Sequence, residues 1–183
     1  MATYHPDQIR TFISKTCQSL GSQQTEAQLV ADNLVEANLA GHDSHGVGML
    51  PTYVDGAVNG RLIINSQPTV LIDRGPLITL DGEAGFGQVN GFEAMKLGIE
   101  RVGVHGAAIV GLRNSYHIGR IGHWAEQCAA SGLASFHLVN VVGHQPIVAA
   151  FGGADARFGT NPFCAAVPGL SLIHISEPTR RSA

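Results

Sequence analysis

The order of apolar and polar positions predicts helices over the first third of the chain. Over residues 7–20 the apolar side chains recur every three or four positions, which is the spacing of one helical face. Thr25 and Gln28 form a capping-box pair, so a second helix is expected to begin there and to end at Gly41. A third helix is expected over about residues 50–58. Together these segments predict a helical N-terminal layer.

Beyond residue 60 the pattern alternates between short apolar runs and helical spacing. Strands are expected at 69–73, 77–81, 107–112, 133–142 and 162–167, with helices at 89–104 and 119–131. The uninterrupted apolar run at 107–112 predicts a buried strand. The fold class is therefore α/β, with a helical segment over 1–65 and a partial α/β domain over 66–169.

Composition narrows the class of protein. The 183 residues are 44% apolar and 14% charged, as in a globular protein, and the formal net charge of −3 offers no basic surface for nucleic acid or anionic membranes. No apolar run is long enough to span a bilayer, and the polar start lacks the pattern of a signal peptide. Three widely spaced cysteines (Cys17, Cys128 and Cys164) indicate reduced thiols in a cytoplasmic protein.

The end of the chain does not match the rest. Residues 170–180, LSLIHISEPTR, resemble the in-frame translation of a sequencing adapter. The residues alone would also permit a short strand with a proline-containing tail. We interpret 170–183 as a non-native tail, leave it out of the functional argument, and expect the natural sequence to be interrupted after Gly169.

The first group of candidate site residues is the segment 41–46, GHDSHG, where the second helix ends. Polar side chains between two glycines suit a site on a turn, and an imidazole can give or take a proton near neutral pH. His42 is interpreted as finishing the helix, where a histidine favours the negative end of the dipole. His45 is interpreted as functional, while His42, Asp43 and His45 together leave a metal-dependent hydrolase as an alternative.

A second group lies at 114–120, NSYHIGR, between a predicted strand and a predicted helix. Ligands bind at such positions in α/β sheets, and helix N-termini attract anions such as phosphates. Gly119 would allow close backbone approach, and Arg120 could contact a phosphate or carboxylate. The alternative is a loop whose polar residues only cap the helix. His123, farther along, is interpreted as a helix-surface residue.

Two glycine-rich segments carry weaker signals. In 158–163, FGTNPF, Thr160 and Asn161 offer hydrogen-bonding groups beside Pro162, although on these residues alone an ordinary surface turn is the simpler interpretation. The segment 85–91, GFGQVNG, follows a strand and opens a helix. Its third glycine falls one residue late for a Rossmann fingerprint, and no acidic strand end follows at the expected distance.

Three runs, in order, resemble the malate/L-lactate dehydrogenase family: NLVEANLAGHDSHGVGMLPTY, LRNSYHIGRIGHWAEQCAASG and RFGTNPFCAAVP. The resemblance covers nearly all of residues 7–168. It implies a cofactor-binding mixed sheet unlike the Rossmann fold, a homodimer, NAD or NADP as cofactor with NAD favoured, and a small 2-hydroxy or 2-oxo acid as substrate. A non-catalytic ligand-binding domain of the same fold is the alternative.

The resemblance also assigns roles to particular residues. It implies that His45, His117 and Ser44 are catalytic, with one histidine exchanging a proton with the substrate oxygen and Ser44 orienting or supplementing His45. It places the dinucleotide against His45, Gly119, Arg120, Ile121, Thr160, Asn161 and Pro162. Which histidine is the proton donor stays open, and no metal is implied.

One position departs from the family. Many relatives carry an arginine shortly after Ser-His-Gly, suited to a substrate carboxylate, whereas this chain has Met49 there. Another basic residue takes that role, or the substrate is held differently, so the choice between lactate, malate and larger hydroxyacids stays open. The rest of the cofactor site is expected beyond Gly169, and the fragment is expected to be inactive alone.

Overall fold

The computed structural model describes residues 4–143 and 145–169, which leaves the adapter-like segment outside the described residues. The chain divides into two compact units, one up to His123 and one from Trp124, and each is described by itself. The predicted boundary at residue 65 is a different division and stays a prediction. None of the helices in the described part is both long and apolar enough to cross a membrane.

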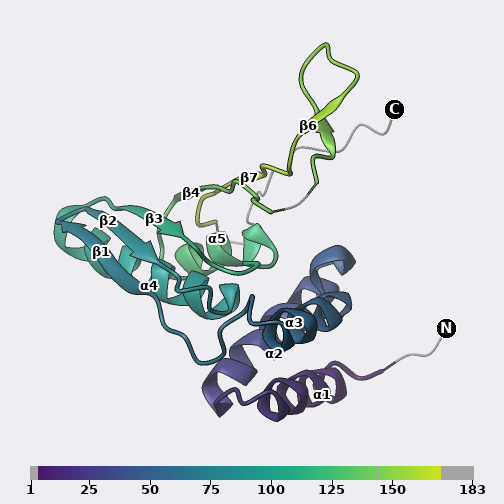
Figure 1. Ribbon diagram of the computed structural model, residues 1–183. Helices are drawn as coiled ribbons and strands as arrows, with labels where there is room; N and C mark the ends of the chain where they lie inside the picture. Colours follow the sequence, from purple (N-terminus) through teal and green to yellow (C-terminus); the bar gives the residue numbers. More distant parts are fainter. Residues whose placement is uncertain (1–3, 144, 170–183) are drawn as a thin grey trace. The chain divides into compact units, whose positions relative to one another are not determined.

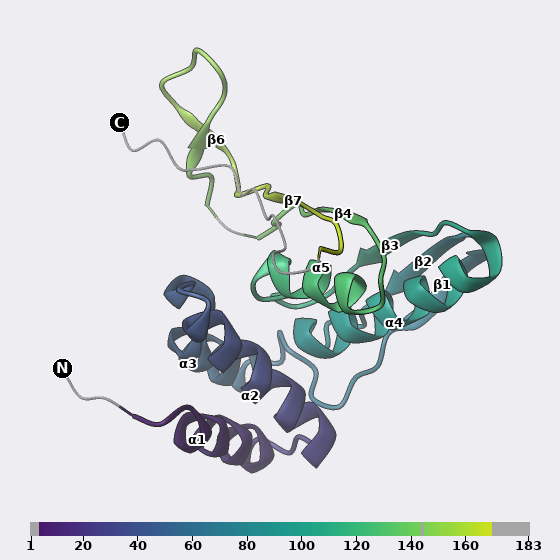
Figure 2. The same cartoon turned by 180° about the vertical axis from the view of Figure 1, so that it is seen from behind.

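The predicted helical layer is confirmed. It consists of α1 (Pro6–Ser19), α2 (Gln24–Leu39) and α3 (Leu50–Val58), with two short 3-10 helices, η1 (Asp43–His45) and η2 (Val47–Met49), between the last two. Figures 1 and 2 show α1 and α2 side by side. The apolar face of each helix enters one core, which includes the fully buried side chains of Ile13, Cys17, Val30, Leu34 and Tyr53.

The start of α2 differs from the prediction. No capping box forms at Thr25 and Gln28, because the N-cap residue is Gln23 and Thr25 already lies inside the helix. The backbone N–H of Gln23 donates instead to Oδ1 of Asn65 at 2.7 Å. The buried carboxylate of Glu26 accepts the backbone N–H of Asn65 at 3.0 Å. A connection distant in sequence therefore replaces the local cap.

The first unit also contains a three-stranded mixed sheet, as predicted. Strands β1 (Thr69–Arg74) and β2 (Leu77–Asp81) are antiparallel, and β3 (Ile109–Arg113) pairs with β2 in parallel. Helix α4 (Gly87–His105) lies along one face of this sheet (Figure 1). Its Ala94 packs with Ile78 and Leu80 of β2 in a small apolar core. Because α4 covers one face and β3 is at the edge of these three strands, the prediction of a buried strand at 107–112 is wrong: Ile109 is 69% exposed.

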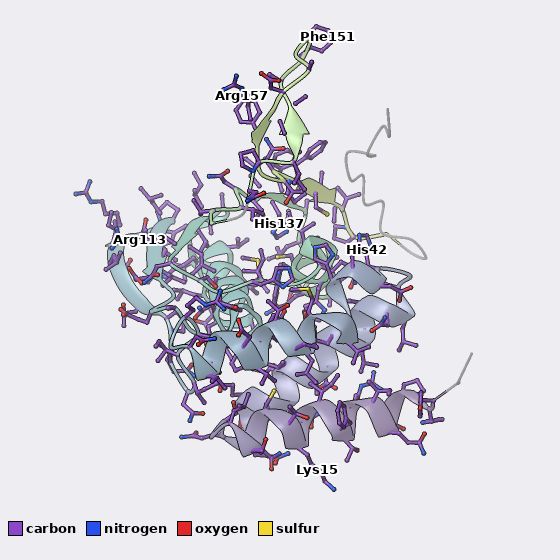
Figure 3. All side chains as sticks on the ribbon, turned by 45° about the vertical axis from the view of Figure 1, so that its right-hand side comes forward. Lys15, His42, Arg113, His137, Phe151 and Arg157 are labelled. Atoms are coloured by element: carbon purple, nitrogen blue, oxygen red, sulfur yellow. The ribbon has the colours of Figure 1, made fainter. Side chains whose placement is uncertain are left out.

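The second unit holds most of α5 (Ile121–Ala130) and two pairs of antiparallel strands. The strands β4 (Ser135–Leu138) and β7 (Phe163–Ala166) confirm the predicted strands at 133–142 and 162–167. The pair β5 (Val148–Ala149) and β6 (Ala156–Phe158) was not predicted, since such short, exposed strands leave no periodic pattern. Figure 3 shows exposed Phe151 in the turn between them.

Candidate active site

The loop that carries Ser44 and His45 is fixed by a side chain from the last turn of α2. Asn38 accepts the backbone N–H of Val47 with Oδ1 at 2.8 Å and donates from Nδ2 to Asp43 at 2.5 Å. A Cβ at position 46 would collide with the Asn38 amide, so glycine is required where the loop passes it. Within this held loop, Ser44 Oγ lies 2.9 Å from Nδ1 of His45, which orients the imidazole as the resemblance implies.

The loop that carries His117 starts from an anchored strand end. Asp81, at the end of β2, accepts the backbone N–H of Glu83 at 2.9 Å and Nδ2 of Asn114 at 2.8 Å, while its other oxygen accepts Nε of Arg113 at 2.9 Å. These partners, the Glu83 N–H first, lower the pKa of the Asp81 carboxyl. They also hold Asn114 at a φ of 50°, where an asparagine is tolerated better than most residues. Hydrogen bonds to the Asp81 carboxylate therefore hold the turn that leads to His117.

Helix α4 reinforces the same loop through its first turn. Buried Asn90 donates from Nδ2 to the carbonyls of Gly82 and Gly85, at 2.9 and 3.2 Å, and to Oγ of Ser115 at 3.1 Å. Gly87 packs directly against the backbone of residues 117 and 118, and a Cβ there would lie 2.6 Å from Cα of Ile118. The segment 85–91 is therefore not a dinucleotide fingerprint in this structure. It is the support on which the His117 loop rests.

The two histidines meet in the first unit. The imidazoles of His45 and His117 stack with ring centroids 5.3 Å apart and planes inclined by 30°. Nδ1 of His117 lies 2.8 Å from the hydroxyl of Tyr53, and that hydroxyl accepts Nε2 of Gln88 at 2.8 Å. Residues far apart in the sequence thus form one polar chain, from Gln88 through Tyr53 and His117 to the stacked His45. Both ends of the histidine pair are held by hydroxyl groups.

The predicted cofactor residues Gly119, Arg120 and Ile121 form the entry to α5. Gly119 has a φ of 74°, which favours glycine, and Ile121 is the first residue of the helix. The Arg120 residue is 7% exposed. The amide of Asn33, from α2, is buried against Gly119, and neither its nitrogen nor its oxygen has a hydrogen-bond partner among the described residues.

The remaining predicted cofactor residues lie in the second unit. Thr160 accepts the backbone N–H of Val141 with its carbonyl at 3.3 Å, and Pro162 accepts that of Val139 at 3.0 Å. Asn161 lies between them, so the segment runs beside the stretch that follows β4. The predicted role of these three residues in binding the cofactor stays a prediction.

Three other residues singled out in the sequence also lie in the first unit. His42, labelled in Figure 3, lies beyond the end of α2, where its ring meets that of His45 edge-on at 5.5 Å. His123 is a residue of α5 with Nδ1 3.1 Å from the carboxylate of Glu36. Met49 ends η2 and packs against the helical core. In the described ranges, no three histidine, cysteine or acidic side chains converge as metal ligands.

Tyr53, Gln88 and Asn38 were not among the site residues predicted from the sequence. Tyr53 lies on the predicted helix 50–58 and counts as an apolar residue in a periodic pattern, so its hydroxyl gave no signal. Gln88 and Asn90 did give one: they are two amide side chains on the buried first turn of α4, where burial requires hydrogen-bond partners. That signal lay within the segment rejected as a Rossmann fingerprint.

Comparisons with known proteins identify the family of this chain. The sequence matches the malate/L-lactate dehydrogenase family over residues 4–175. It is 55% identical over 160 residues to hydroxycarboxylate dehydrogenase B of Escherichia coli (strain K12), covering 87% of this chain and 44% of that protein. It is 41% identical over 152 residues to an L-lactate dehydrogenase of Cupriavidus necator, covering 81% of this chain and 44% of that protein.

Solved structures give the same result. The malate dehydrogenase of Pyrococcus horikoshii OT3 superposes with a TM-score of 0.89 at 35% identity, covering 96% of this chain and 50% of that one. The chain thus spans about half the length of the relatives it matches. These names give no support to a metal-dependent hydrolase or a non-catalytic binding domain. By its sequence match and its fold, the chain belongs to the malate/L-lactate dehydrogenase family.

Proposed function

We propose that this chain is the N-terminal half of an NAD(P)-dependent 2-hydroxyacid dehydrogenase and supplies its proton-transfer residues. The observation that carries the proposal is the pair of stacked imidazoles, His45 and His117, each held at Nδ1 by a hydroxyl group, from Ser44 and Tyr53. A ring tied at one nitrogen presents the other in a fixed direction, as a general acid or base requires. The names of the relatives, which include hydroxycarboxylate and lactate dehydrogenases, support the same reaction class.

The entry to α5 fits the anionic part of a dinucleotide. The first N–H groups of a helix are not used within it, so they can bind a phosphate, and the helix dipole favours a negative charge there. Gly119 makes room for the buried amide of Asn33, which has no partner among the described residues, and Arg120 supplies a positive charge. When bound, the nicotinamide exchanges a hydride with C2 of the substrate.

The chain's own residues handle the proton. In oxidation of a hydroxyacid, one imidazole takes the proton from the hydroxyl oxygen as C2 becomes a carbonyl carbon. In reduction the same imidazole returns it. His117 is our choice for this role, because its Nδ1 is tied to the fully buried Tyr53, whereas the Ser44 hydroxyl beside His45 is exposed. His45, stacked on it, would then contact the substrate or the nicotinamide.

Further properties of the whole enzyme belong to the same proposal. The substrate is a 2-hydroxy or 2-oxo acid of the malate, lactate or hydroxycarboxylate type, and NAD is favoured over NADP. Met49 carries no charge and packs against the helical core, so the substrate carboxylate needs a cation from elsewhere. The whole enzyme is proposed to be a homodimer in the cytoplasm, and the three free cysteines fit a reducing compartment.

Alanine substitutions in the full-length enzyme test the proposal. H117A should lower kcat by about 10²- to 10⁴-fold, the usual contribution of a general acid or base. Its fold should survive, because the loop is held by backbone hydrogen bonds such as Tyr116 N–H to the Gly85 carbonyl at 3.1 Å. H105A, at the exposed end of α4, is the matched control and should keep full turnover. Near-normal turnover in both H117A and H45A would refute the assignment.

A further inference from the structure

Gln88 is a polar residue at a fully buried position, where an apolar side chain would be expected. It lies in the first turn of α4, is 1% exposed, and packs inside the unit that holds both histidines. Its Nε2 donates to Oη of Tyr53 at 2.8 Å, while its Oε1 is buried without a partner among the described residues. A buried amide oxygen without a hydrogen bond is costly, so this half of the side chain calls for an explanation.

The hydroxyl of Tyr53 can arrange its proton in two ways. Burial raises the pKa of Tyr53, so the hydroxyl keeps its proton at working pH. A hydroxyl has one hydrogen to donate. While Oη accepts from Gln88, that hydrogen must point to Nδ1 of His117, 2.8 Å away. Neutral His117 then carries its own proton on Nε2.

That arrangement does not suit a proton-transfer residue. With Nε2 already protonated and Nδ1 accepting, neutral His117 cannot take a proton from a hydroxyacid at Nε2. The competent base has its proton on Nδ1, which then donates to Tyr53 Oη. The tyrosine hydrogen must in that case turn away from the histidine and find another acceptor. A half-turn of the Gln88 amide exchanges its nitrogen and oxygen, which brings Oε1 to the position that now holds Nε2.

We propose that Gln88 is a positioning residue whose amide, by turning over, lets Tyr53 either donate to or accept from Nδ1 of His117. With Nε2 of Gln88 on Tyr53, His117 rests with its proton on Nε2. With Oε1 on Tyr53, the hydrogen bonds run from His117 to Tyr53 to Gln88, and Nε2 is the base. This inference rests on the proposed role of His117.

The proton balance is complete within this chain of hydrogen bonds. In oxidation the hydroxyl proton of the substrate moves to Nε2, and His117 becomes an imidazolium with hydrogens on both nitrogens. Nδ1 keeps donating to Tyr53, and Tyr53 keeps donating to Oε1 of Gln88, so neither of them changes protonation. In reduction the imidazolium returns the Nε2 proton to the substrate oxygen. The resting arrangement differs from the working one in the orientation of the amide, in the direction of the tyrosine hydrogen and in the nitrogen of neutral His117 that carries its proton. Their interconversion therefore returns one proton from one ring nitrogen to water and takes one up at the other.

Two substitutions at Gln88 in the full-length enzyme separate this role from simple packing. Q88M keeps the length but cannot accept from Tyr53, so His117 stays in its resting form; kcat should fall about 100-fold with KM little changed. The carboxylate of Q88E accepts from Tyr53 and has no hydrogen to donate, so this variant should be at least about tenfold more active than Q88M. A residue needed only for packing would give the reverse order, since methionine is the better core residue and a buried carboxylate the worse one. The reverse order would overturn the inference.

Combining Q88M with Y53F tests the inference even if Q88E fails to fold. Gln88 acts on His117 only through the Tyr53 hydroxyl, so Q88M should cost nothing further in enzyme that already carries Y53F. An equal loss of kcat from Q88M in both backgrounds would contradict the inference.

Nitrogen NMR of the histidine-labelled enzyme observes the proton arrangement directly. His117, assigned by comparison with H117A, should show its proton on Nε2 throughout the Q88M population. A signal from the form protonated on Nδ1 in Q88M would refute the inference. Failure of the inference and failure of the proposed function remain distinct. Near-normal turnover in both H117A and H45A removes the function, whereas inactive H117A with fully active Q88M removes only the role of Gln88.

Discussion

Replacing Gly87 by alanine should disturb the candidate site through the backbone of the His117 loop. Gly87 is the first residue of α4, and its backbone does not need the left-handed conformation, so conformation alone would permit alanine. Space does not. The new Cβ would lie 2.6 Å from Cα of Ile118 and closer still to the carbonyl group of His117. These are backbone atoms, which cannot rotate away as a side chain can.

The expected magnitude follows from that distance. Carbon atoms in contact need about 3.5 Å, so the loop or the start of α4 must move by about 1 Å. A misplacement of about 1 Å at a catalytic group costs about 10²-fold in rate. Overpacking of this kind also costs about 1–3 kcal/mol of stability, against which the better helix propensity of alanine returns about 0.5–1 kcal/mol. We expect G87A to be folded, less stable by about 1–2 kcal/mol, and about 100-fold slower.

Gly103 provides the matched control within the same helix. A Cβ there would meet nothing within 4 Å, so G103A should gain about 0.5–1 kcal/mol and keep full turnover. The assay is steady-state NAD(P)H oxidation with a 2-oxo acid, together with urea unfolding of both variants and wild type. If G87A matched G103A in both turnover and stability, the His117 loop would not rest on Gly87, and our account of residues 85–91 would be wrong.

Three further predictions concern the surroundings of the site. Burial, helped by Glu26, raises the pKa of Cys17 to about 11, so iodoacetamide at pH 8 should leave Cys17 unlabelled in native protein and label it fully after unfolding, as peptide mass mapping can show. The lowered pKa of Asp81 means that this carboxylate stabilises the fold above its ordinary pKa of about 3.9 and loses that effect as pH falls through the lowered value. D81N should therefore unfold more easily than wild type at pH 7, with a difference that shrinks in acid; a constant difference in denaturant titrations would contradict this. N38L removes both bonds that fix the Ser44–His45 loop, so kcat should fall while the midpoint of thermal unfolding falls only modestly, and unchanged kcat would show that the loop needs no such anchor.

The sequence was sufficient to predict the elements whose periodicity spans several turns or a whole strand. Helix α3 and strand β2 occupy the predicted residues, because apolar spacing and the turn residues beside them are local signals. The start of α2 was not predictable in this way. The backbone N–H of its N-cap residue, Gln23, donates to Asn65, about forty positions away, and only the tertiary structure shows that.

The residues of the candidate site also differ in whether local sequence signals predict them. Ser44, His45 and His117 stand in short motifs, so the residues themselves and the family resemblance were enough to select them. Tyr53 and Gln88 act through hydrogen bonds between α3, α4 and the loop after β3. The hydroxyl of a tyrosine on an apolar helix face can take part in a site only if a suitable hydrogen-bond partner lies opposite it. A periodic pattern does not contain that information.

The most direct test of the central claim is the turnover of the full-length protein with a nicotinamide cofactor. Purified enzyme would be mixed with NADH or NADPH and, in turn, 2-oxo acids of the lactate and malate types, and the loss of reduced cofactor would be followed by absorbance. We predict steady oxidation with at least one of these acids, formation of an equal amount of the 2-hydroxy acid, and loss of both in H117A. A folded full-length protein that oxidised neither cofactor with any 2-oxo acid would contradict the account.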